Sequence, residues 1–250
     1  MADSIRTKAI VLNSIRWQDS SKIVSLFTEN AGIVKVIVRG AFRSNSPFAG
    51  KLESMLIVEA IILVKESRSL QILKEIEVTD TLSRIKSDMN IYPYGFAILE
   101  IVSQLFNDHP ADPVFYNFIV TMLESIQKIK NPAVVILYLL LKVASYLGFK
   151  PNLQTCQSGE MQNCDQSVFL SLDDGSIFCK NCGIIGSNIL KLKREEFYYL
   201  KNLQNWNHRR ITDIINDHPN LDNLTQLMLN YINFHLEHEL RMSALHMLGK

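Results

Sequence analysis

The sequence predicts a multi-domain protein of α and β structure, with a small N-terminal β-barrel followed by a helical domain that carries a cysteine-rich insertion. Three observations lead to this prediction. Apolar and polar residues alternate through residues 1–80, apolar residues then recur every three or four positions, and all four cysteines lie between residues 150 and 190. Alternation is the period of a strand, and the longer recurrence is that of a helix. We therefore expect domains over 1–80 and 81–250, with the insertion at about 150–186.

Five segments of the first domain have the length and composition of strands. In IRTKAIVL, which begins at Ile5, uncharged residues occupy every second position and Arg6 and Lys8 fall between them. IVKVIVRG, from Ile33 to Gly40, repeats this alternation, so its valines are expected to point inward. Three further runs have strand composition and turn residues at their ends: SKIVSLFT, MLIVEAIILV and LQILKEIEV. Five short strands indicate a small barrel.

Helical spacing begins after the fifth strand. Apolar residues recur at this spacing over 94–106 and 114–129, and the string HPADP separates the two segments. Helices are expected again from Lys191 onward. The last of them has an apolar stripe made of Leu224, Leu227, Met228, Tyr231 and Ile232.

The helix between these segments has clear ends. Asn131 can cap it, and Pro132 suits the first helical position. Gly148 and Pro151 supply the stop. Its stretch AVVILYLLLKVASYL is apolar on nearly every side, which indicates a central helix that is buried all round.

The four cysteines have the spacing C-x7-C-x14-C-x2-C: Cys156, Cys164, Cys179 and Cys182. A C-x2-C pair followed by glycine, as in CKNCG, can wrap one side of a tetrahedral zinc ion, whereas the first pair is wider than in common zinc sites. We expect a structural Zn²⁺, because four protein ligands leave no position for water. A redox pair, or simple burial of the thiols, is the alternative.

Enzyme signatures and membrane signals are missing from the sequence. It contains no Walker-type loop, no G-x-G-x-x-G and no G-x-S-x-G. The string HLEH at His235 matches no zinc-protease pattern and is interpreted as a solvated helix face. No apolar run approaches the roughly 20 residues of a spanning helix, and the start lacks the apolar block of a signal peptide. We expect a cytoplasmic protein with no catalytic residues.

Positive charge is concentrated in the first domain, although the whole chain has a net charge of only +1. Residues 1–51 hold eight basic and three acidic residues, and residues 52–80 hold three basic and six acidic residues. A barrel with cations on one face, and with Ile37 and Phe42 available for base contact, suits a single nucleic-acid strand. The candidate contacts are Arg6, Lys8, Lys35, Arg39, Arg43 and Lys51. The alternative is that these cations only keep a half-exposed sheet soluble.

The order of these features resembles the RecO family of bacterial recombination mediator proteins. DSSKIVSLFTENAGIVKVIVRGAFRSNSPFAGKLESM looks like the first half-barrel of that family, with its glycine turn and its Gly-Ala-x-Arg loop. LGFKPNLQTC and GSIFCKNC resemble the entries to the two metal-binding cysteine pairs, and YINFHLEHELRMSALHML is similar to the closing helix. Two departures are visible, since the first cysteine pair is stretched and Asn45 stands where a lysine is common.

The resemblance implies an OB-fold domain on a helical domain with a four-cysteine zinc module, and a non-enzymatic role in DNA repair close to the nucleoid. It also implies binding of single- and double-stranded DNA, annealing of complementary strands, and help in loading RecA onto DNA covered by single-strand-binding protein. The implied partners are RecR and the tail of single-strand-binding protein. The competing interpretation is a zinc-containing protein-interaction scaffold that does not bind DNA.

Overall fold

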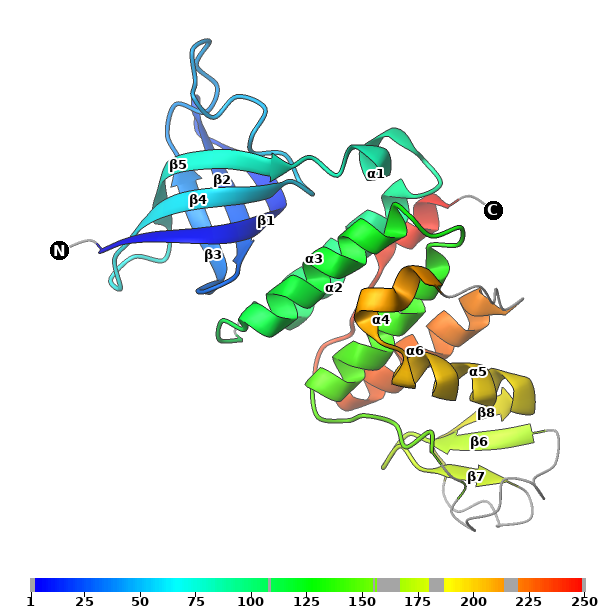
Figure 1. Ribbon diagram of the computed structural model, residues 1–250. Helices are drawn as coiled ribbons and strands as arrows, with labels where there is room; N and C mark the ends of the chain where they lie inside the picture. The colour runs from blue at the N-terminus through cyan, green and yellow to red at the C-terminus, as the bar shows by residue number, and fades with distance from the viewer. Residues whose placement is uncertain are drawn as a thin grey trace. The chain divides into compact units, whose positions relative to one another are not determined.

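The computed structural model describes residues 3–107, 109–154, 156, 167–179, 187–213 and 220–248. The chain divides into two compact units, one made of residues 1–128 with 241–250 and the other of residues 129–240. The barrel predicted over residues 1–80 forms part of the first unit, which also contains the helices that follow the barrel in the chain (Figure 1).

The five N-terminal strands form a closed barrel with the order β1-β2-β3-β5-β4. Neighbouring strands are antiparallel except for β3 and β5, which are parallel. The strands are β1 (Asp3–Trp17), β2 (Ser21–Thr28), β3 (Gly32–Val38), β4 (Ile57–Val64) and β5 (Gln71–Asp80). The predicted five-stranded sheet and the helical region after it are confirmed, in an OB-like layout.

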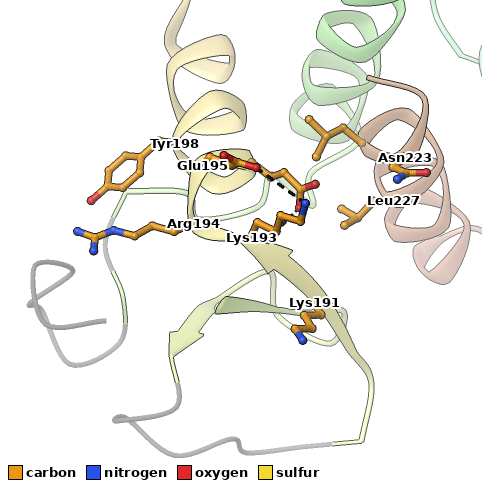
Figure 2. A pocket seen from close by; sticks show the side chains of 9 residues that line it. Lys191, Lys193, Arg194, Glu195, Tyr198, Asn223 and Leu227 are labelled. Atoms are coloured by element: carbon orange, nitrogen blue, oxygen red, sulfur yellow. Dashed lines mark hydrogen bonds and ion pairs between the residues drawn. The ribbon is translucent and has the colours of Figure 1, made fainter. Parts of the chain in front are cut away.

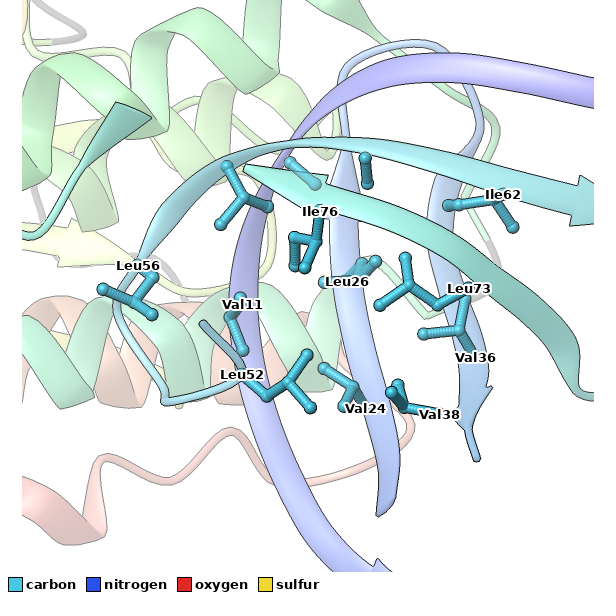
Figure 3. Close-up of a cluster of buried hydrophobic side chains, with 13 residues drawn as sticks. Val11, Val24, Leu26, Val36, Val38, Leu52, Leu56, Ile62, Leu73 and Ile76 are labelled. Atoms are coloured by element: carbon cyan, nitrogen blue, oxygen red, sulfur yellow. The ribbon is translucent and has the colours of Figure 1, made fainter. Parts of the chain in front are cut away.

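Aliphatic side chains from all five strands fill the barrel (Figure 3). The alternation predicted from the sequence is confirmed here, since Val11, Val36 and Val38 are fully buried. Leu52 and Leu56 come from the loop between β3 and β4 and belong to the same core. Backbone bonds between this loop and β1 hold them there: the N–H of Met55 donates to the carbonyl oxygen of Val11, and the N–H of Val11 donates to that of Leu56.

Three helices continue the first unit: α1 (Ser83–Ser87), α2 (Tyr92–Leu105) and α3 (Pro113–Ile126). The break at HPADP is confirmed, because Asp112 caps α3 and its Oδ1 accepts from the N–H groups of Val114 and Phe115 at 2.9 and 3.0 Å. Phe115 and Tyr116 then contact Phe27 of β2, with ring centroids 6.4 and 5.7 Å apart. Aromatic side chains of α3 thereby cover the outer side of β2 at Phe27.

The segment 241–247 also belongs to the first unit and lies against α2. It contains the 3-10 helix η4 (Ser243–Met247). The side chain of Gln104 donates to the carbonyl oxygen of Arg241 at 2.7 Å and accepts from its N–H at 3.0 Å. The N–H of Ala244 donates to Oε2 of Glu100 at 3.1 Å. Polar side chains of α2 thus satisfy the backbone of this segment.

The second unit combines helices with a three-stranded sheet of order β7-β6-β8. Its elements are α4 (Ala133–Tyr146), β6 (Ser167–Ser171), β7 (Ile177–Cys179), β8 (Ile189–Lys193), α5 (Arg194–Asn205), the 3-10 helix η3 (His208–Asp213) and α6 (Leu221–His235). The prediction of helix from Lys191 onward was early by three residues. The reason is that ILKLK alternates apolar and basic residues, so it continues as a strand until Lys193.

The central position predicted for α4 is confirmed, since eleven of its fourteen residues are buried. Oδ1 of Asn131 accepts from the N–H of Ala133 at 3.1 Å, as its capping role requires. The one cation of this helix, Lys142, donates from Nζ to the carbonyl oxygen of Gln204 at 2.7 Å. Burial lowers the pKa of Lys142, and Lys150 lowers it further. Within the described residues, no helix has the length and apolar character needed to cross a membrane.

Replacing Tyr116 with phenylalanine should increase the free energy of unfolding by about 1 kcal/mol. The Tyr116 hydroxyl is buried and has no hydrogen-bond partner among the described residues, so its removal relieves a desolvation penalty. Burial also raises the pKa of this hydroxyl. Urea denaturation followed by circular dichroism measures the change.

Tyr138→Phe is the matched control for that experiment. The Tyr138 hydroxyl donates to the carbonyl oxygen of Trp206 at 2.8 Å, so its loss should decrease the free energy of unfolding by about 1 kcal/mol. Equal destabilisation by both substitutions would contradict the assignment of an unsatisfied hydroxyl to Tyr116.

Candidate nucleic-acid interface

The outer surface of the barrel has two sides of different chemistry, and the six predicted cations are divided between them. We name the outer side of β1, β4 and β5 around Glu59 the β4–β5 face. We name the outer side of β1, β2 and β3 around Ile23 the β2–β3 face. Each is defined by the strand register, because residues paired across a ladder direct their side chains to the same side.

Carboxylates surround the predicted cations of the β4–β5 face. Arg6 donates from Nη2 and Nε to Oε2 of Glu59 at 2.6 and 3.1 Å. The hydrogen bond and charge of Glu59 raise the pKa of Arg6, with smaller contributions from Glu77 and Glu75. In the register, Lys8 lies opposite Glu59, and Glu59 lies opposite Glu77. A phosphate that binds Arg6 therefore competes with Glu59, and one that approaches Lys8 meets the negative charge of Glu59 and Glu77 on the same face.

Lys51 lies beside the same face, in a pocket of about 360 Å³ that Arg6, Glu59 and Glu77 also line. Its Nζ donates to the carbonyl oxygen of Ile76 at 3.3 Å. The ammonium group is therefore already engaged by the backbone of β5.

The β2–β3 face carries an apolar row that crosses three strands. Ile15 of β1 pairs with Ile23 of β2, and Ile23 pairs with Ile37 of β3. Ile15 is 55% exposed, and the other two side chains are half-buried. Lys35 and Arg39 lie two residues before and two residues after Ile37, and both are exposed. Two of the predicted cations thus flank a partly exposed apolar row.

Aromatic rings and further cations gather where β1 meets β2. Phe42 is 47% exposed, and its ring centroid lies 5.2 Å from Cζ of Arg16 and 5.4 Å from Nζ of Lys22. The N–H of Phe42 donates to the carbonyl oxygen of Ser20, which fixes the loop against the β1–β2 turn. Trp17, in the same strand as Ile15, is 44% exposed. These contacts place Arg16 and Lys22 beside a ring that retains open area for a ligand, and Nζ of Lys22 also contacts Oε1 of Glu53 at 3.1 Å.

Arg43 follows directly in this loop. Its N–H donates to the carbonyl oxygen of Gly40 at 3.1 Å, and its side chain lies over that glycine, because a Cβ added there would meet Cδ of Arg43 at 3.2 Å. Gly40 has a φ of +70°, which glycine adopts without strain. The turn thus fixes the side chain of Arg43 over Gly40.

The structure therefore places Lys35 and Arg39 on the β2–β3 face and Arg43 over Gly40 in the loop that follows, and it leaves Arg6, Lys8 and Lys51 on or beside the carboxylate-rich face. Sequence reasoning did not select Arg16, Trp17 or Lys22. A cation next to an aromatic residue, Arg16-Trp17, stands just before the turn-forming QDSS, and this pair could have indicated a nucleic-acid contact.

Two of the four predicted zinc ligands lie in the described part of the second unit. Cys156 forms a parallel bridge with Ile177, and Cys179 lies two residues further along β7. Both cysteines therefore direct their side chains to the same side of the sheet, and both are only 1% exposed. Buried sulfur donors on one side of a small sheet suit a thiolate-bound zinc ion.

The other two predicted ligands, Cys164 and Cys182, lie outside the described residues. In the described part of the chain, no group of three or more metal-binding side chains is found.

The turn before β7 is well defined, since Oδ1 of Asp174 accepts from the N–H and Oγ of Ser176 at 3.1 and 2.7 Å. The Ser176 hydroxyl is the main cause that lowers the pKa of Asp174.

Comparison with known proteins gives matches along nearly the whole chain. The family model described as Recombination protein O N terminal matches residues 1–82, and the model described as Recombination protein O C terminal matches residues 86–244. A protein of Prosthecochloris aestuarii named DNA repair protein RecO is 24% identical over 94% of this chain and 92% of its own length. Proteins of the same name from Chlorobium phaeobacteroides and Salinibacter ruber are 25% and 31% identical, over 94% and 70% of this chain and 93% and 66% of their own lengths.

The thiol pair leads to a prediction about metal content. If Cys156 and Cys179 bind zinc, the purified chain should contain about one zinc ion, and Cys179→Ser should lose most of it because one of four ligands is removed. Inductively coupled plasma mass spectrometry provides the measurement. Ser187→Ala changes an exposed residue of the same region and should retain the metal. A wild-type zinc content well below one ion per chain would refute the site.

Proposed function

The chain belongs to the RecO family of DNA recombination and repair proteins, and from this premise we propose that it is a recombination mediator that binds DNA through its barrel. In this proposal it binds single- and double-stranded DNA, anneals complementary strands and helps to load RecA onto DNA covered by single-strand-binding protein. Its membership of the family supports a role in DNA repair and recombination.

The observation that carries the proposal is the β2–β3 face. It combines a partly exposed aliphatic row, the cations Lys35 and Arg39 beside that row, and the exposed rings of Trp17 and Phe42. A single nucleic-acid strand needs both properties, since its phosphates require cations and its unstacked bases require an apolar or aromatic surface. Cations that contact phosphate and apolar side chains that support base faces read no base edge, so binding in this mode would be independent of sequence.

Annealing follows from this kind of binding without a chemical step. Two complementary strands repel each other through their phosphates, and lysine and arginine side chains reduce this repulsion. Bases that rest on side chains, rather than bonding through their edges, remain available for pairing. The proposed activity is therefore non-enzymatic.

The six cations predicted from the sequence have different parts in the proposal. Lys35, Arg39 and Arg43 make the first contacts with phosphate. Arg6, Lys8 and Lys51 contribute only where a phosphate replaces the carboxylate or carbonyl group that now engages or opposes them. The acidic side chains of the β4–β5 face direct DNA toward the opposite side of the barrel.

Partners and metal are proposed on the family relationship. We propose that a RecR-type protein and the tail of single-strand-binding protein bind this chain. RecA would be an indirect partner, because the chain helps to load it onto DNA. We further propose a structural zinc ion bound by Cys156, Cys164, Cys179 and Cys182. Such an ion would stabilise the small sheet of the second unit and take no part in DNA chemistry.

A scaffold that binds only proteins is the alternative, and the Arg6–Glu59 ion pair favours it for the β4–β5 face. An annealing assay with two complementary oligonucleotides separates the two functions, because a scaffold does not accelerate duplex formation. Annealing of strands coated with single-strand-binding protein, with and without prior chelation, also tests whether metal is needed.

Replacing both Arg39 and Arg43 with alanine should weaken binding of a single-stranded oligonucleotide. The slope of log affinity against log salt should flatten by about 0.7 for each phosphate contact that is lost. Fluorescence anisotropy over a range of salt concentrations measures both effects. Lys128→Ala, at an exposed position beyond the barrel, is the control and should leave the slope unchanged. An unchanged slope in the double variant would exclude both arginines from the interface.

Glu59→Gln should have the opposite effect on affinity. It removes the carboxylate that binds Arg6 and lies opposite Lys8, so these cations become available to phosphate. We expect tighter binding of the same oligonucleotide and a steeper salt slope, by about 0.7 for one added contact. If neither quantity changes, the β4–β5 face does not contact DNA.

A further inference from the structure

Charged side chains gather at the end of the barrel where β2 begins. Lys22 of β2 pairs with Arg16 of β1 on one side and with Val38 of β3 on the other. Residues paired in this way point to the same side of a sheet, and Val38 is fully buried. Arg16 and Lys22 therefore lie on the interior side of their strands, at the end of the barrel core. The row of isoleucines lies on the other side of the same strands.

We name Arg16, Lys22, Phe42 and Glu53 the mouth cluster. Nζ of Lys22 donates to Oε1 of Glu53 at 3.1 Å, and the Lys22 side chain is only 18% exposed. The same Nζ lies 5.4 Å from the centroid of the Phe42 ring, and Cζ of Arg16 lies 5.2 Å from it. A carboxylate oxygen and a phosphate oxygen make the same kind of contact with an ammonium group. Glu53 thus occupies an anion position beside an exposed aromatic ring.

The backbone that carries Glu53 is fixed independently of the ion pair. Met55, two residues further on, is fully buried and has a φ of +70°. Its side chain packs against α1 and α2, because a Cβ added to Gly95 would meet Sδ of Met55 at 2.6 Å and Cγ2 of Ile85 at 2.7 Å. The absence of a side chain at Gly95 is what admits Met55 to this position. The loop therefore presents Glu53 to Lys22 from a constrained backbone.

The charge of Glu53 acts on a second lysine as well. Burial lowers the pKa of Lys86 in α1, and the charge of Glu53 acts on this pKa in the opposite direction. One carboxylate therefore interacts with two cations, Lys22 of the barrel and Lys86 of the helix. A phosphate that takes the place of Glu53 beside Lys22 leaves the carboxylate with Lys86 as a partner. The cost of breaking the first ion pair is reduced in this way.

The ion pair between Lys193 and Glu195 in the second unit, drawn in Figure 2, differs from this arrangement. Its N–O distance is 3.9 Å, and its side chains are 63% and 65% exposed. Exposed pairs of this kind contribute little free energy. Lys22 is mostly covered, by contrast, and its partner extends from a constrained loop. The pair in the second unit is therefore a suitable reference for the one at the barrel.

We propose that Glu53 is an internal substitute for a phosphate group, and that a DNA strand on the barrel exchanges one of its phosphates for this carboxylate at Lys22. This inference rests on the proposed function, since it requires DNA binding by the barrel. In the exchanged state a phosphate oxygen accepts from Nζ of Lys22, Glu53 keeps its interaction with Lys86, and the Phe42 ring lies next to the bound phosphate. Every strand must compete with a carboxylate that the fold holds in place, so Glu53 limits the affinity for DNA.

The first test measures binding of a short fluorescein-labelled oligothymidylate to the full chain by anisotropy over a range of salt concentrations. Glu53→Gln should bind about threefold more tightly, which is the scale of one partly exposed ion pair. The slope of log affinity against log salt should steepen by about 0.7, because Lys22 gains a phosphate contact without giving up a carboxylate. Glu195→Gln removes the carboxylate of the reference pair and the same amount of charge, and it should bind as wild type.

A second pair of variants tests whether the effect of Glu53 passes through Lys22. Lys22→Met keeps an unbranched side chain beside Phe42 but removes the ammonium group, so it should weaken binding of the oligonucleotide. In this background Glu53→Gln should leave the salt slope unchanged, because no ammonium group remains to be freed. A slope that still steepens would overturn the exchange at Lys22. Lys22→Gln serves if Lys22→Met fails to fold, as judged by circular dichroism.

A methylphosphonate analogue of the same oligonucleotide separates phosphate exchange from an effect on the bases. Its backbone is uncharged, so Glu53→Gln should not tighten its binding. Equal tightening for the charged and uncharged strands would show that Glu53 acts without phosphate, and the proposal would be wrong. If the wild-type chain binds the natural strand and Glu53→Gln changes neither affinity nor slope, the exchange alone is refuted. A wild-type chain that does not bind would refute the proposed function and the exchange together.

Discussion

Closure of the barrel is the constraint on which the rest of the first unit depends. The seam is short, since parallel β3 and β5 are joined by the pairs Val36 with Gln71 and Ile37 with Ile72. Closure gives every strand two neighbours, so the backbone is satisfied around the circumference and one set of alternating side chains is committed to the interior. The outward-facing set does not have to fill the interior. Its composition can therefore differ from one side to the other, with isoleucines and cations over β2 and β3 and carboxylates over β4 and β5.

The sequence predicts the elements of this fold well because their signals are local. Alternation identified the interior residues Ala9, Val11 and Val36, and capping residues identified the ends of α4. Long-range contacts were not predictable in the same way. Ile10 is fully buried although alternation places it opposite the core, and Phe27, its partner in β2, is buried against α3. A single sequence holds no record of which outer residues a later helix will cover.

The same limit applies to the candidate interface and to the metal site. Arg6 and Glu59 are 53 positions apart, and only the register of β1 with β4 brings them together. His235 was interpreted as part of a solvated face, yet its ring stacks on Phe149 with centroids 4.7 Å apart. The C-x2-C pair was visible from spacing alone, whereas the shared orientation of Cys156 and Cys179 required the small sheet. Sequence spacing reveals functional residues that are neighbours along the chain, whereas contacts between distant residues depend on the topology of the fold.

The return of residues 241–247 to α2 has a consequence for the order in which this protein is made. Residues 129–240 are inserted, in the topological sense, into the first unit, whose surface on α2 is completed by a segment translated after them. Residues 1–80 leave the ribosome early, and together they contain the whole hydrophobic interior of the barrel. The backbone partners of Gln104 and Glu100 are synthesised only after the entire second unit. Maturation of the first unit therefore cannot be purely vectorial, because its final contacts await the emergence of the polypeptide beyond residue 240.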